Sequence, residues 1–297
     1  MELVVFGAGS LGSLIGGILA REHAVTLVGR DPHVSAVDAE GLTITGEIEA
    51  SVAPAAGTAP PERADLAVVT VKSFDTPAAV DALADCSLDG VLSLQNGMGN
   101  EERLVEGLDC PVLAGTCTYG ARLAAPGEVE CTGIGEITLG PLEGGNSPLA
   151  SHTGKAFDRA GLVTTVSSAM PRQRWAKLAV NAGINAPTAL ARIQNGVLGN
   201  SPAGSVATAA ARETARVARE CGIDLDGEHA VERMQSVASA TAVNTSSMHQ
   251  DVLAERRTEI DAINGYVVDR TENSVPVNET LTALVRGWER GQGLRPA

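Results

Sequence analysis

The stretch between Arg174 and Leu190 combines residue types that could do chemistry. If it is helical, Lys177, Asn181 and Asn185 recur every four residues and share one stripe, while nearly every other position is apolar. Surface helices are polar over a much wider face, so this pattern predicts a buried helix with one thin polar line. Buried polar groups need partners, which indicates a site for a polar ligand where burial lowers the pKa of the lysine and makes it a usable proton donor. The alternative is a stripe that meets only polar groups of the protein itself.

Lysine is scarce in this chain, which favours a functional interpretation of Lys177. The 22 basic residues include three lysines, at positions 72, 155 and 177, and therefore nineteen arginines. A lysine kept on a predicted buried helix, in a chain that otherwise uses arginine, indicates a task that depends on the ammonium group.

A glycine-rich turn follows the first apolar segment. Residues 3–6 predict a buried strand, residues 13–20 predict a helix, and between them stand Gly7, Ala8, Gly9, Ser10, Leu11 and Gly12. This is a GxGxxG pattern in its strand-to-helix context, where glycines let the backbone approach a pyrophosphate and the helix N-terminus attracts its charge. The turn predicts a bound dinucleotide; the alternative is a tight turn without a ligand.

The second predicted strand, residues 24–28, ends in Gly29 and Arg30, where NAD-specific proteins carry an acid for the ribose hydroxyls. Arg30 could instead pair with a 2′-phosphate, which favours NADP. Asp31 follows directly and keeps NAD as an alternative, and a solvated surface arginine is the third interpretation.

Two further predicted strands, residues 66–71 and 90–94, are followed by Lys72 and Asn96. Open α/β sheets bind ligands at the carboxyl ends of their strands, so both residues are expected at that edge. A surface lysine and an Asn-Gly turn are the alternatives.

The strand signals stop at residue 166, and helical periodicity dominates from residue 169. We therefore predict an α/β Rossmann domain at residues 1–167 and an all-α domain at residues 168–297. In the first domain we expect a hairpin over residues 42–52, a loop over 53–61, an antiparallel pair of 127–132 with 137–139, and an exposed helix over 147–160. In the second we expect helices over 203–221, 227–239, 251–273 and 278–290, with Asn278 as an N-cap and Ser246 or Ser247 as a cap.

Composition narrows the class of function. A net charge of −14 and a pI near 4.8 disfavour nucleic acid and anionic membranes as partners. Five scattered cysteines without a CxxC, and no HExxH, argue for reduced thiols and no metal. Without a signal peptide or an apolar run of membrane-spanning length, a cytoplasmic location is expected. Acidity, few lysines and only seven aromatic residues suggest a halophilic source.

Together these pieces resemble the ketopantoate reductase (2-dehydropantoate 2-reductase) family, which belongs to the 6-phosphogluconate-dehydrogenase-like enzymes. The resemblance runs nearly end to end, and its order and spacing carry it. The matching segments are residues 7–12, 69–72, 95–99, 175–178 with Asn181 and Asn185, 244–251, and 258–266.

The resemblance implies a role for each matching residue. Residues 7–12 would bind the pyrophosphate, Arg30 and Lys72 would lie along the cofactor, and Asn96 and Ala121 would contact its nicotinamide half. Lys177 would be the proton donor, and Glu259 would touch the cofactor near the reacting centre; Glu259 could equally be an exposed helix acid. The remaining implied substrate contacts, beside Asn96, are Asn181, Asn185, Asn195, Asn244 and Ser247.

The expected activity is NADPH-dependent reduction of 2-dehydropantoate to (R)-pantoate, a step toward pantothenate and coenzyme A. The expected partner is a small 2-keto acid, and a homodimer is one option for assembly. One alternative is a reductase of this fold acting on another branched 2-keto acid, because the shape of the pocket sets that choice. Another is a non-catalytic dinucleotide-sensing protein, which would be expected to lack Lys177 or Glu259.

Overall fold

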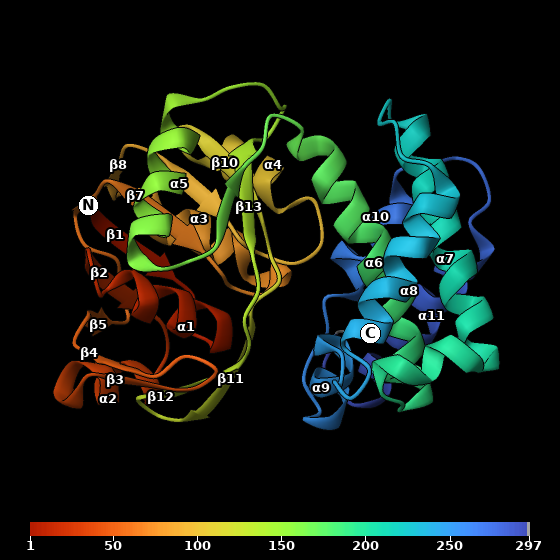
Figure 1. The fold of residues 1–297 in the computed structure, drawn as a ribbon, viewed down its shortest axis with the longest axis horizontal. Coiled ribbons are helices and arrows are strands. Elements are labelled where there is room, and N and C mark those ends of the chain that lie inside the picture. The colour runs from red at the N-terminus through yellow and green to blue at the C-terminus, as the bar shows by residue number, and fades with distance from the viewer. Residues whose placement is uncertain (296–297) are drawn as a thin grey trace. The chain divides into compact units, whose positions relative to one another are not determined.

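The computed structural model describes residues 1–295 and divides into two compact units (Figure 1). The sheet unit comprises Met1–Gln95 and Asn100–Met170, and the helical unit comprises Asn96–Gly99 and the chain from Pro171 onward. Parallel strands dominate the first unit and helices the second, so the predicted class, an α/β domain followed by an all-α domain, is confirmed. Where the sequence placed the boundary at residues 167 and 168, the structural units change after Met170, and the loop Asn96–Gly99 groups with the helices.

An eight-stranded sheet forms the centre of the sheet unit. Its strands follow the spatial order β14 (Thr164–Val166), β13 (Ile137–Pro141), β10 (Val112–Cys117), β9 (Val91–Ser93), β7 (Leu66–Val69), β1 (Glu2–Phe6), β2 (Ala24–Val28) and β5 (Ala55–Gly57). β1 pairs in parallel with β2 and β7, and β9 with β7 and β10, whereas β13 runs antiparallel to β10. The chain leaves β1 toward β2 and later returns to the opposite side of β1 at β7. The point beside β1 is thus the topological switch point at which such sheets bind ligands.

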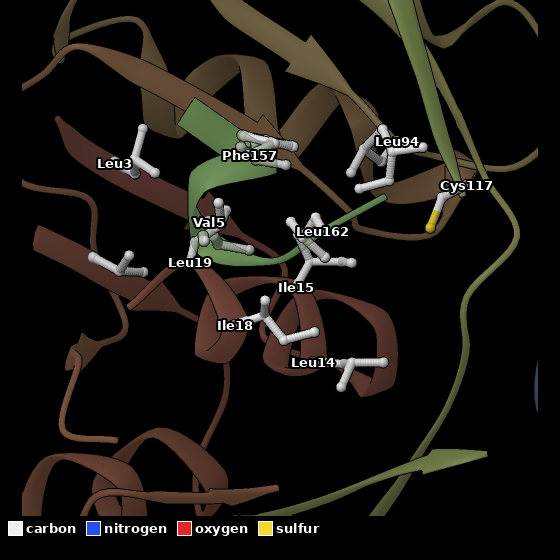
Figure 2. Packing of buried hydrophobic residues seen from close by; sticks show 14 of the residues in the cluster. Leu3, Val5, Leu14, Ile15, Ile18, Leu19, Leu94, Cys117, Phe157 and Leu162 are labelled. Atoms are coloured by element: carbon white, nitrogen blue, oxygen red, sulfur yellow. The ribbon is translucent and has the colours of Figure 1, made fainter. Parts of the chain in front are cut away.

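Both faces of this sheet are covered by helices, which explains why its strands are apolar at successive positions. The helices of the unit are α1 (Ser10–Leu19), α2 (His33–Glu40), η1 (Ser73–Asp75), α3 (Thr76–Leu83), α4 (Asn100–Gly107) and α5 (Pro148–Ala160). On β1, Leu3 and Val5 share a core with Ile15 of α1 and Phe157 of α5 (Figure 2), while Val4 shares another with side chains of α3 and α4. The prediction of an exposed helix at 147–160 was wrong in this respect, because α5 buries Phe157 completely.

A second, four-stranded sheet has the order β11 (Gly120–Ala125), β12 (Glu128–Gly133), β3 (Leu42–Gly46) and β4 (Ala50–Val52), and β6 (Arg63–Ala64) pairs with β8 (Ser87–Leu88). The predicted hairpin of β3 and β4 is confirmed. The predicted pairing of residues 127–132 with 137–139 was wrong, because β12 pairs with β11 and β3, and β13 pairs with β10. Residues 53–61 are also more than a loop, since β5 extends the larger sheet there.

The helical unit is built from α6 (Met170–Ala191), η2 (Asn195–Asn200), α7 (Pro202–Glu220), α8 (Gly227–Ala240), α9 (Ser247–Leu253), η3 (Ile260–Ala262), α10 (Asn264–Asp269) and α11 (Pro276–Gly291). No helix within residues 1–295 combines the length and apolarity needed to cross a bilayer.

The long helix predicted over residues 251–273 was wrong. Glu255 adopts a left-handed backbone conformation with φ of 50° just after α9 ends. A few residues later, the Thr258 N–H donates to the Glu289 carboxylate, so the helical ladder does not continue. Asn278 is likewise not an N-cap, because α11 begins at Pro276 and the Asn278 side chain is fully buried, where it donates to Glu213.

Candidate active site

The glycine turn between β1 and α1 is fixed by contacts on both sides. The N–H groups of Gly7 and Ala8 donate to the Val28 carbonyl at 2.9 and 2.8 Å, and Thr70 Oγ1 donates to the Gly7 carbonyl at 2.9 Å. Gly7 has a φ of +115°, which favours glycine. A Cβ atom on Gly12 would collide with the Gly7 carbonyl oxygen and with Thr70 Oγ1. The first and last glycines of the motif are therefore required by packing.

The middle glycine leaves the N-terminus of α1 open. Gly9 is the N-cap of this helix, and among the described residues no side chain caps it. A Cβ atom on Gly9 would have only the Gly7 carbonyl oxygen within 4 Å, at 3.9 Å, so there is room beside this backbone. Exposed N–H groups at a helix N-terminus bind phosphates. The turn thus fits the pyrophosphate of a dinucleotide.

The strands on either side of this turn end in register. Phe6 is paired with Val28 and Val69, and Val69 is paired with Ser93. The segments that follow β1, β2 and β7 therefore leave the sheet at one edge, which places Gly7, Arg30 and Lys72 along that edge. Lys72 is half-buried and precedes η1 as its N-cap residue.

Arg30 is held by an acid that the sequence did not single out. Its side chain is 87% exposed, and its guanidinium donates to Asp75 Oδ2 at 2.8 Å. Asp31, the alternative ribose ligand, instead accepts a short hydrogen bond from Ser35 Oγ on the first turns of α2. Of the two neighbours, Arg30 is thus the one that points toward the segment after β7.

Ala121 is brought to the same helix terminus. Ser10, the first residue of α1, accepts a hydrogen bond from the Leu123 N–H at 3.0 Å. This bond ties β11, and with it the half-buried Ala121, to the end of α1 that carries the glycine turn.

A buried amide network fixes the chain after β7 and β9. The Gln95 side chain is only 4% exposed, and its Nε2 donates to the Val71 carbonyl at 3.1 Å and to Thr76 Oγ1 at 2.8 Å. Thr76 Oγ1 also lies 3.1 Å from Asn100 Oδ1. These contacts hold the two loops that carry Lys72 and Asn96.

The loop Asn96–Gly99 packs within the helical unit against η3. The Met98 N–H donates to the Ala262 carbonyl at 2.9 Å, and a Cβ atom on Gly97 would lie only 2.5 Å from Ala262 Cβ. Gly97 has a φ of +79°, so only glycine allows this close approach without strain. The loop therefore places Asn96 near the segment that carries Glu259.

The polar stripe on α6 lies between two apolar cores. Asn185 is 6% exposed, while Lys177 and Asn181 are half-buried. One core contains Trp175, Ala179, Ala182 and Ala186 of this helix, and the other contains Val180 and Ile184. In addition, Trp175 packs on Tyr266 with 5.9 Å between ring centroids. Between Trp175 and Ala186, the polar residues Lys177, Asn181 and Asn185 belong to neither core.

The start of α9 is tied to α6 close to Asn185. Thr188 Oγ1 and Ser246 Oγ are 2.8 Å apart, and Ser246 caps α9 by accepting the His249 N–H at 3.2 Å. The expected serine cap is thus confirmed at Ser246. Ser247, the next residue, is exposed and begins the helix.

Asn195 and Asn244 lie on two segments that are hydrogen-bonded to each other. The Asn195 N–H donates to the Asn244 carbonyl at 3.0 Å, and Asn195 Nδ2 donates to Thr241 Oγ1 at 2.9 Å. Asn195 Oδ1 is buried without a hydrogen-bond partner among the described residues. Asn244 is exposed. The Asn195 amide nitrogen thus has a structural task, and its substrate contact stays a prediction.

Glu259 is 5% exposed, so the alternative of an exposed helix acid was wrong. It precedes η3, and its carbonyl accepts the N–H groups of Ala262 and Ile263 at 3.1 and 3.2 Å. On one side, Thr258 is bonded to the fully buried Glu289; on the other, Asp261 is bonded to Arg286 and Arg295.

Charges in this region shift one another's pKa values. Burial acts to raise the pKa of the Asp261 carboxyl, but hydrogen bonds from Arg295 and Arg286 outweigh it, so the pKa is lowered. Burial acts to lower the pKa of Arg295, and its bonds to Asp261 and Glu289 raise it above the usual value. Both pKa shifts favour the charged forms of Asp261 and Arg295.

The predicted residues fall into two groups, one in each unit. The sheet unit carries the glycine turn, Arg30, Lys72 and Ala121. The helical unit carries the others, namely Asn96, Lys177, Asn181, Asn185, Asn195, Asn244, Ser247 and Glu259.

Sequence reasoning missed the residues that hold these groups in place, including Asp75, Gln95, Glu289 and Arg295. Glu289 had a visible signal: it follows Leu281 and Val285 at steps of four residues, and an acid on that apolar line predicts a buried partner.

Within residues 1–295 no group of three or more His, Cys, Asp or Glu side chains could hold a metal ion.

Comparisons with known proteins agree with this two-part organisation. The family model described as Ketopantoate reductase PanE/ApbA matches residues 3–144, and its C-terminal counterpart, Ketopantoate reductase PanE/ApbA C terminal, matches residues 169–289. A 2-dehydropantoate 2-reductase of Halobacterium salinarum is 43% identical over 302 residues, covering 98% of this chain and 99% of the relative. A 2-dehydropantoate 2-reductase of Pyrococcus horikoshii is 36% identical over 296 residues, covering 97% and 98% of the two chains.

Solved structures share the fold along the whole chain. A PanE/ApbA family ketopantoate reductase from Ralstonia eutropha superposes with a TM-score of 0.91 at 32% identity, covering 99% of this chain and 100% of the other. A D-mandelate dehydrogenase solved with NADH superposes with a TM-score of 0.88 at 25% identity, covering 98% and 100%.

A dinucleotide-type turn on a parallel sheet, followed by a helical unit with a lysine on a polar stripe, defines a class of two-domain oxidoreductases. Both family models and the full-length relatives identify the member of that class. The chain belongs to the ketopantoate reductase family.

Proposed function

We propose that this protein is an NADPH-dependent reductase that converts 2-dehydropantoate to (R)-pantoate. The observation that carries the proposal is the stripe of Lys177, Asn181 and Asn185, the polar residues that belong to neither apolar core along the buried middle of α6. The names of the full-length relatives support the choice of substrate.

Different side chains of this protein would donate the proton and bind the substrate in the reduction of a keto acid. NADPH, when bound, supplies a hydride to the carbonyl carbon of the keto acid. The Lys177 ammonium donates a proton to the oxygen of that carbonyl as its negative charge develops, and solvent returns the proton to the amine afterwards. Asn181, Asn185 and Ser247 provide donors for the carboxylate and hydroxyl of the substrate without adding another buried charge.

The sheet unit would hold the cofactor. The open N-terminus of α1 beside Gly9 would hold the pyrophosphate, and the Arg30 guanidinium would hold the 2′-phosphate. Asp31 already accepts a hydrogen bond from Ser35, which supports Arg30 over Asp31 as the residue that binds the ribose 2′ position. The preference for NADPH over NADH rests on this assignment.

A panel of 2-keto acids, assayed by NADPH oxidation, tests the substrate. We expect 2-dehydropantoate to give the highest kcat/KM, because donors placed for its hydroxyl reject analogues that lack it more strongly than an apolar pocket could. The matched control is 2-ketoisovalerate, which lacks only the hydroxymethyl group. Equal rates with the two acids would contradict the proposed substrate, and would favour a reductase of another branched 2-keto acid.

The same protein tests the non-catalytic alternative. A sensor would bind NADPH, as followed by quenching of protein fluorescence, and would turn over none of the keto acids. Steady turnover of any of them excludes that alternative.

A further inference from the structure

The last described residue, Arg295, reaches both sides of the segment that carries Glu259. Its Nε donates to Glu289 Oε2 at 2.9 Å, and its terminal nitrogen donates to Asp261 Oδ2 at 2.5 Å. The Arg295 side chain is only 15% exposed, although it is followed by just two residues of the given sequence. The Arg295 side chain is thus packed into the helical unit.

Glu289, which accepts a hydrogen bond from Arg295, also accepts hydrogen bonds from Thr258, the residue before Glu259. Its side chain is fully buried, and Oε1 accepts the Thr258 N–H at 2.8 Å and Thr258 Oγ1 at 2.7 Å. The same Thr258 hydroxyl accepts the Ile260 N–H at 3.2 Å. The backbone on each side of Glu259 is therefore fixed to one buried carboxylate.

Asp261 completes the cluster on the far side. Besides Arg295, it accepts from Arg286 Nε at 2.8 Å, and Arg257 approaches it at 3.6 Å. Because Asp261 belongs to η3 and Glu289 to α11, Arg295 joins the two elements across Glu259.

We propose that Arg295 is a positioning residue that sets the conformation of residues 258–263 and, through them, the placement of the Glu259 carboxylate. This inference rests on the proposed function and on the role that the family resemblance implies for Glu259, contact with the cofactor near the reacting centre. The planar guanidinium is what the arrangement needs, because it serves two carboxylates in fixed directions, whereas an ammonium is a single point of charge. A small displacement of a reacting group is enough to slow an enzyme by roughly a hundredfold.

Two substitutions, Arg295→Lys and Arg295→Ala, test this in the full-length protein, with Arg290→Ala as the matched control. Arg290 is exposed and lies in the last turn of α11, next to Glu289. Arg295→Lys retains a cation near Glu289, which protects the fold, but loses the fork that reaches Asp261. Peptide-level hydrogen exchange then compares residues 258–263 in the four proteins without any need for turnover.

We expect faster exchange in residues 258–263 for both Arg295 variants and no change for Arg290→Ala. Unchanged exchange in that segment would overturn the proposed positioning role of Arg295, whatever substrate the enzyme uses. This readout separates the inference from the proposed function, which fails if wild-type protein turns over no keto acid.

A double-mutant cycle tests the action through Glu259. Arg295→Lys alone should lower kcat by roughly ten- to a hundredfold with a smaller change in KM, and should lower it by less than about threefold in a Glu259→Gln background. An equal loss of kcat in both backgrounds would show that Arg295 acts independently of Glu259, and would overturn the positioning role.

Discussion

The Arg30 guanidinium and the Asp75 carboxylate form an ion pair of 2.8 Å that joins the segment after β2 to the start of α3. The residue proposed to bind the 2′-phosphate of NADPH is therefore already paired with an acid. Both side chains are accessible, 87% for Arg30 and 31% for Asp75, so a phosphate can displace the carboxylate or share the guanidinium with it. Under this proposal, preference for NADPH depends on a competition between the 2′-phosphate and the Asp75 carboxylate for one guanidinium.

Asp75→Asn should strengthen NADPH binding at low salt. Exposed ion pairs contribute up to about 1 kcal/mol, which corresponds to a decrease of about two- to fivefold in KM for NADPH. NADH offers Arg30 only a hydroxyl, so its KM should change little. Steady-state kinetics with both cofactors measure this, and Asp81→Asn, an exposed change of equal charge on α3, is the control. A weaker affinity for NADPH would mean that Asp75 instead orients Arg30 for the phosphate.

Arg30→Ala should raise KM for NADPH by about tenfold, near the low end expected for a charged hydrogen bond, because the guanidinium is exposed and partly neutralised by Asp75. The measurement belongs at the lowest salt that the fold tolerates. If wild-type enzyme prefers NADH and Asp31→Ala is the damaging change, the assignment of Arg30 is wrong.

The two glycines at the start of α1 should respond differently to a methyl group. Gly12→Ala forces a Cβ atom against the Gly7 carbonyl and Thr70, so it should lower the melting temperature as well as activity. A Cβ atom in Gly9→Ala meets only the Gly7 carbonyl oxygen, at an ordinary contact distance of 3.9 Å, so the melting temperature without cofactor should stay within about 2 °C of wild type. Its affinity for NADPH, measured by calorimetry, should nevertheless fall about tenfold or more if the pyrophosphate lies beside Gly9. Wild-type affinity in Gly9→Ala would place the phosphates elsewhere.

Lys177→Ala should lower kcat by roughly 10²- to 10⁴-fold, the usual range for loss of a general acid. Binding of NADPH should change much less. Lys155→Ala, which removes an exposed lysine from α5, is the control and should leave kcat near wild type. Glu259→Gln should also slow turnover. If Lys177→Ala changes only KM, the lysine binds the substrate and the proton comes from another group.

The sequence predicted the elements whose patterns are local. The apolar strand, the glycine turn and the following helix at residues 3–20 form one continuous signal, and the stripe on α6 follows from helical spacing alone. The break between α9 and η3 could not be predicted in this way, because it depends on Thr258 bonding to Glu289, 31 residues away. Pairing of β12 with β3 also depends on tertiary contacts between distant segments.

The supporting side chains were missed for the same reason. The role of Asp75 depends on its ion pair with Arg30, which lies 45 residues earlier in the sequence, so local spacing could not predict it. In the sequence, Arg295 is indistinguishable from an ordinary surface arginine. Only the fold places it between the carboxylates of Glu289 and Asp261. Residue type and local spacing therefore predicted which groups could react, whereas the groups that hold them depend on long-range contacts.

Salt should stabilise the fold. A net charge of −14 produces repulsion that ions screen, so the melting temperature should rise between dilute buffer and molar KCl. Calorimetry at several KCl concentrations measures this, with NaCl as a second salt of equal ionic strength. A melting temperature and activity that are insensitive to salt would reject the halophilic interpretation.

His33 is buried as a neutral imidazole in the sheet unit. The Gly127 N–H donates to His33 Nδ1 at 3.1 Å, so Nε2 carries the proton and donates to Ser13 Oγ at 2.9 Å. Burial lowers the pKa of the His33 imidazole below the usual value for histidine. A second proton on Nδ1 would also break the bond from Gly127, which ties the turn before β12 to the helices α1 and α2.

Stability should therefore decrease as the pH falls below about 6.5. In that range the unfolded chain binds a proton on His33 and the folded protein does not, so the free energy of unfolding falls with decreasing pH until the lowered folded pKa is reached. His33→Gln should melt lower than wild type at neutral pH, because it loses a fitted side chain, but its melting temperature should vary less between about pH 7.5 and about pH 5.5. Urea unfolding at each pH provides the free energies, and His152→Gln, an exposed change on α5, should keep the wild-type pH dependence. Equal pH slopes for His33→Gln and wild type would show that this histidine does not control acid sensitivity.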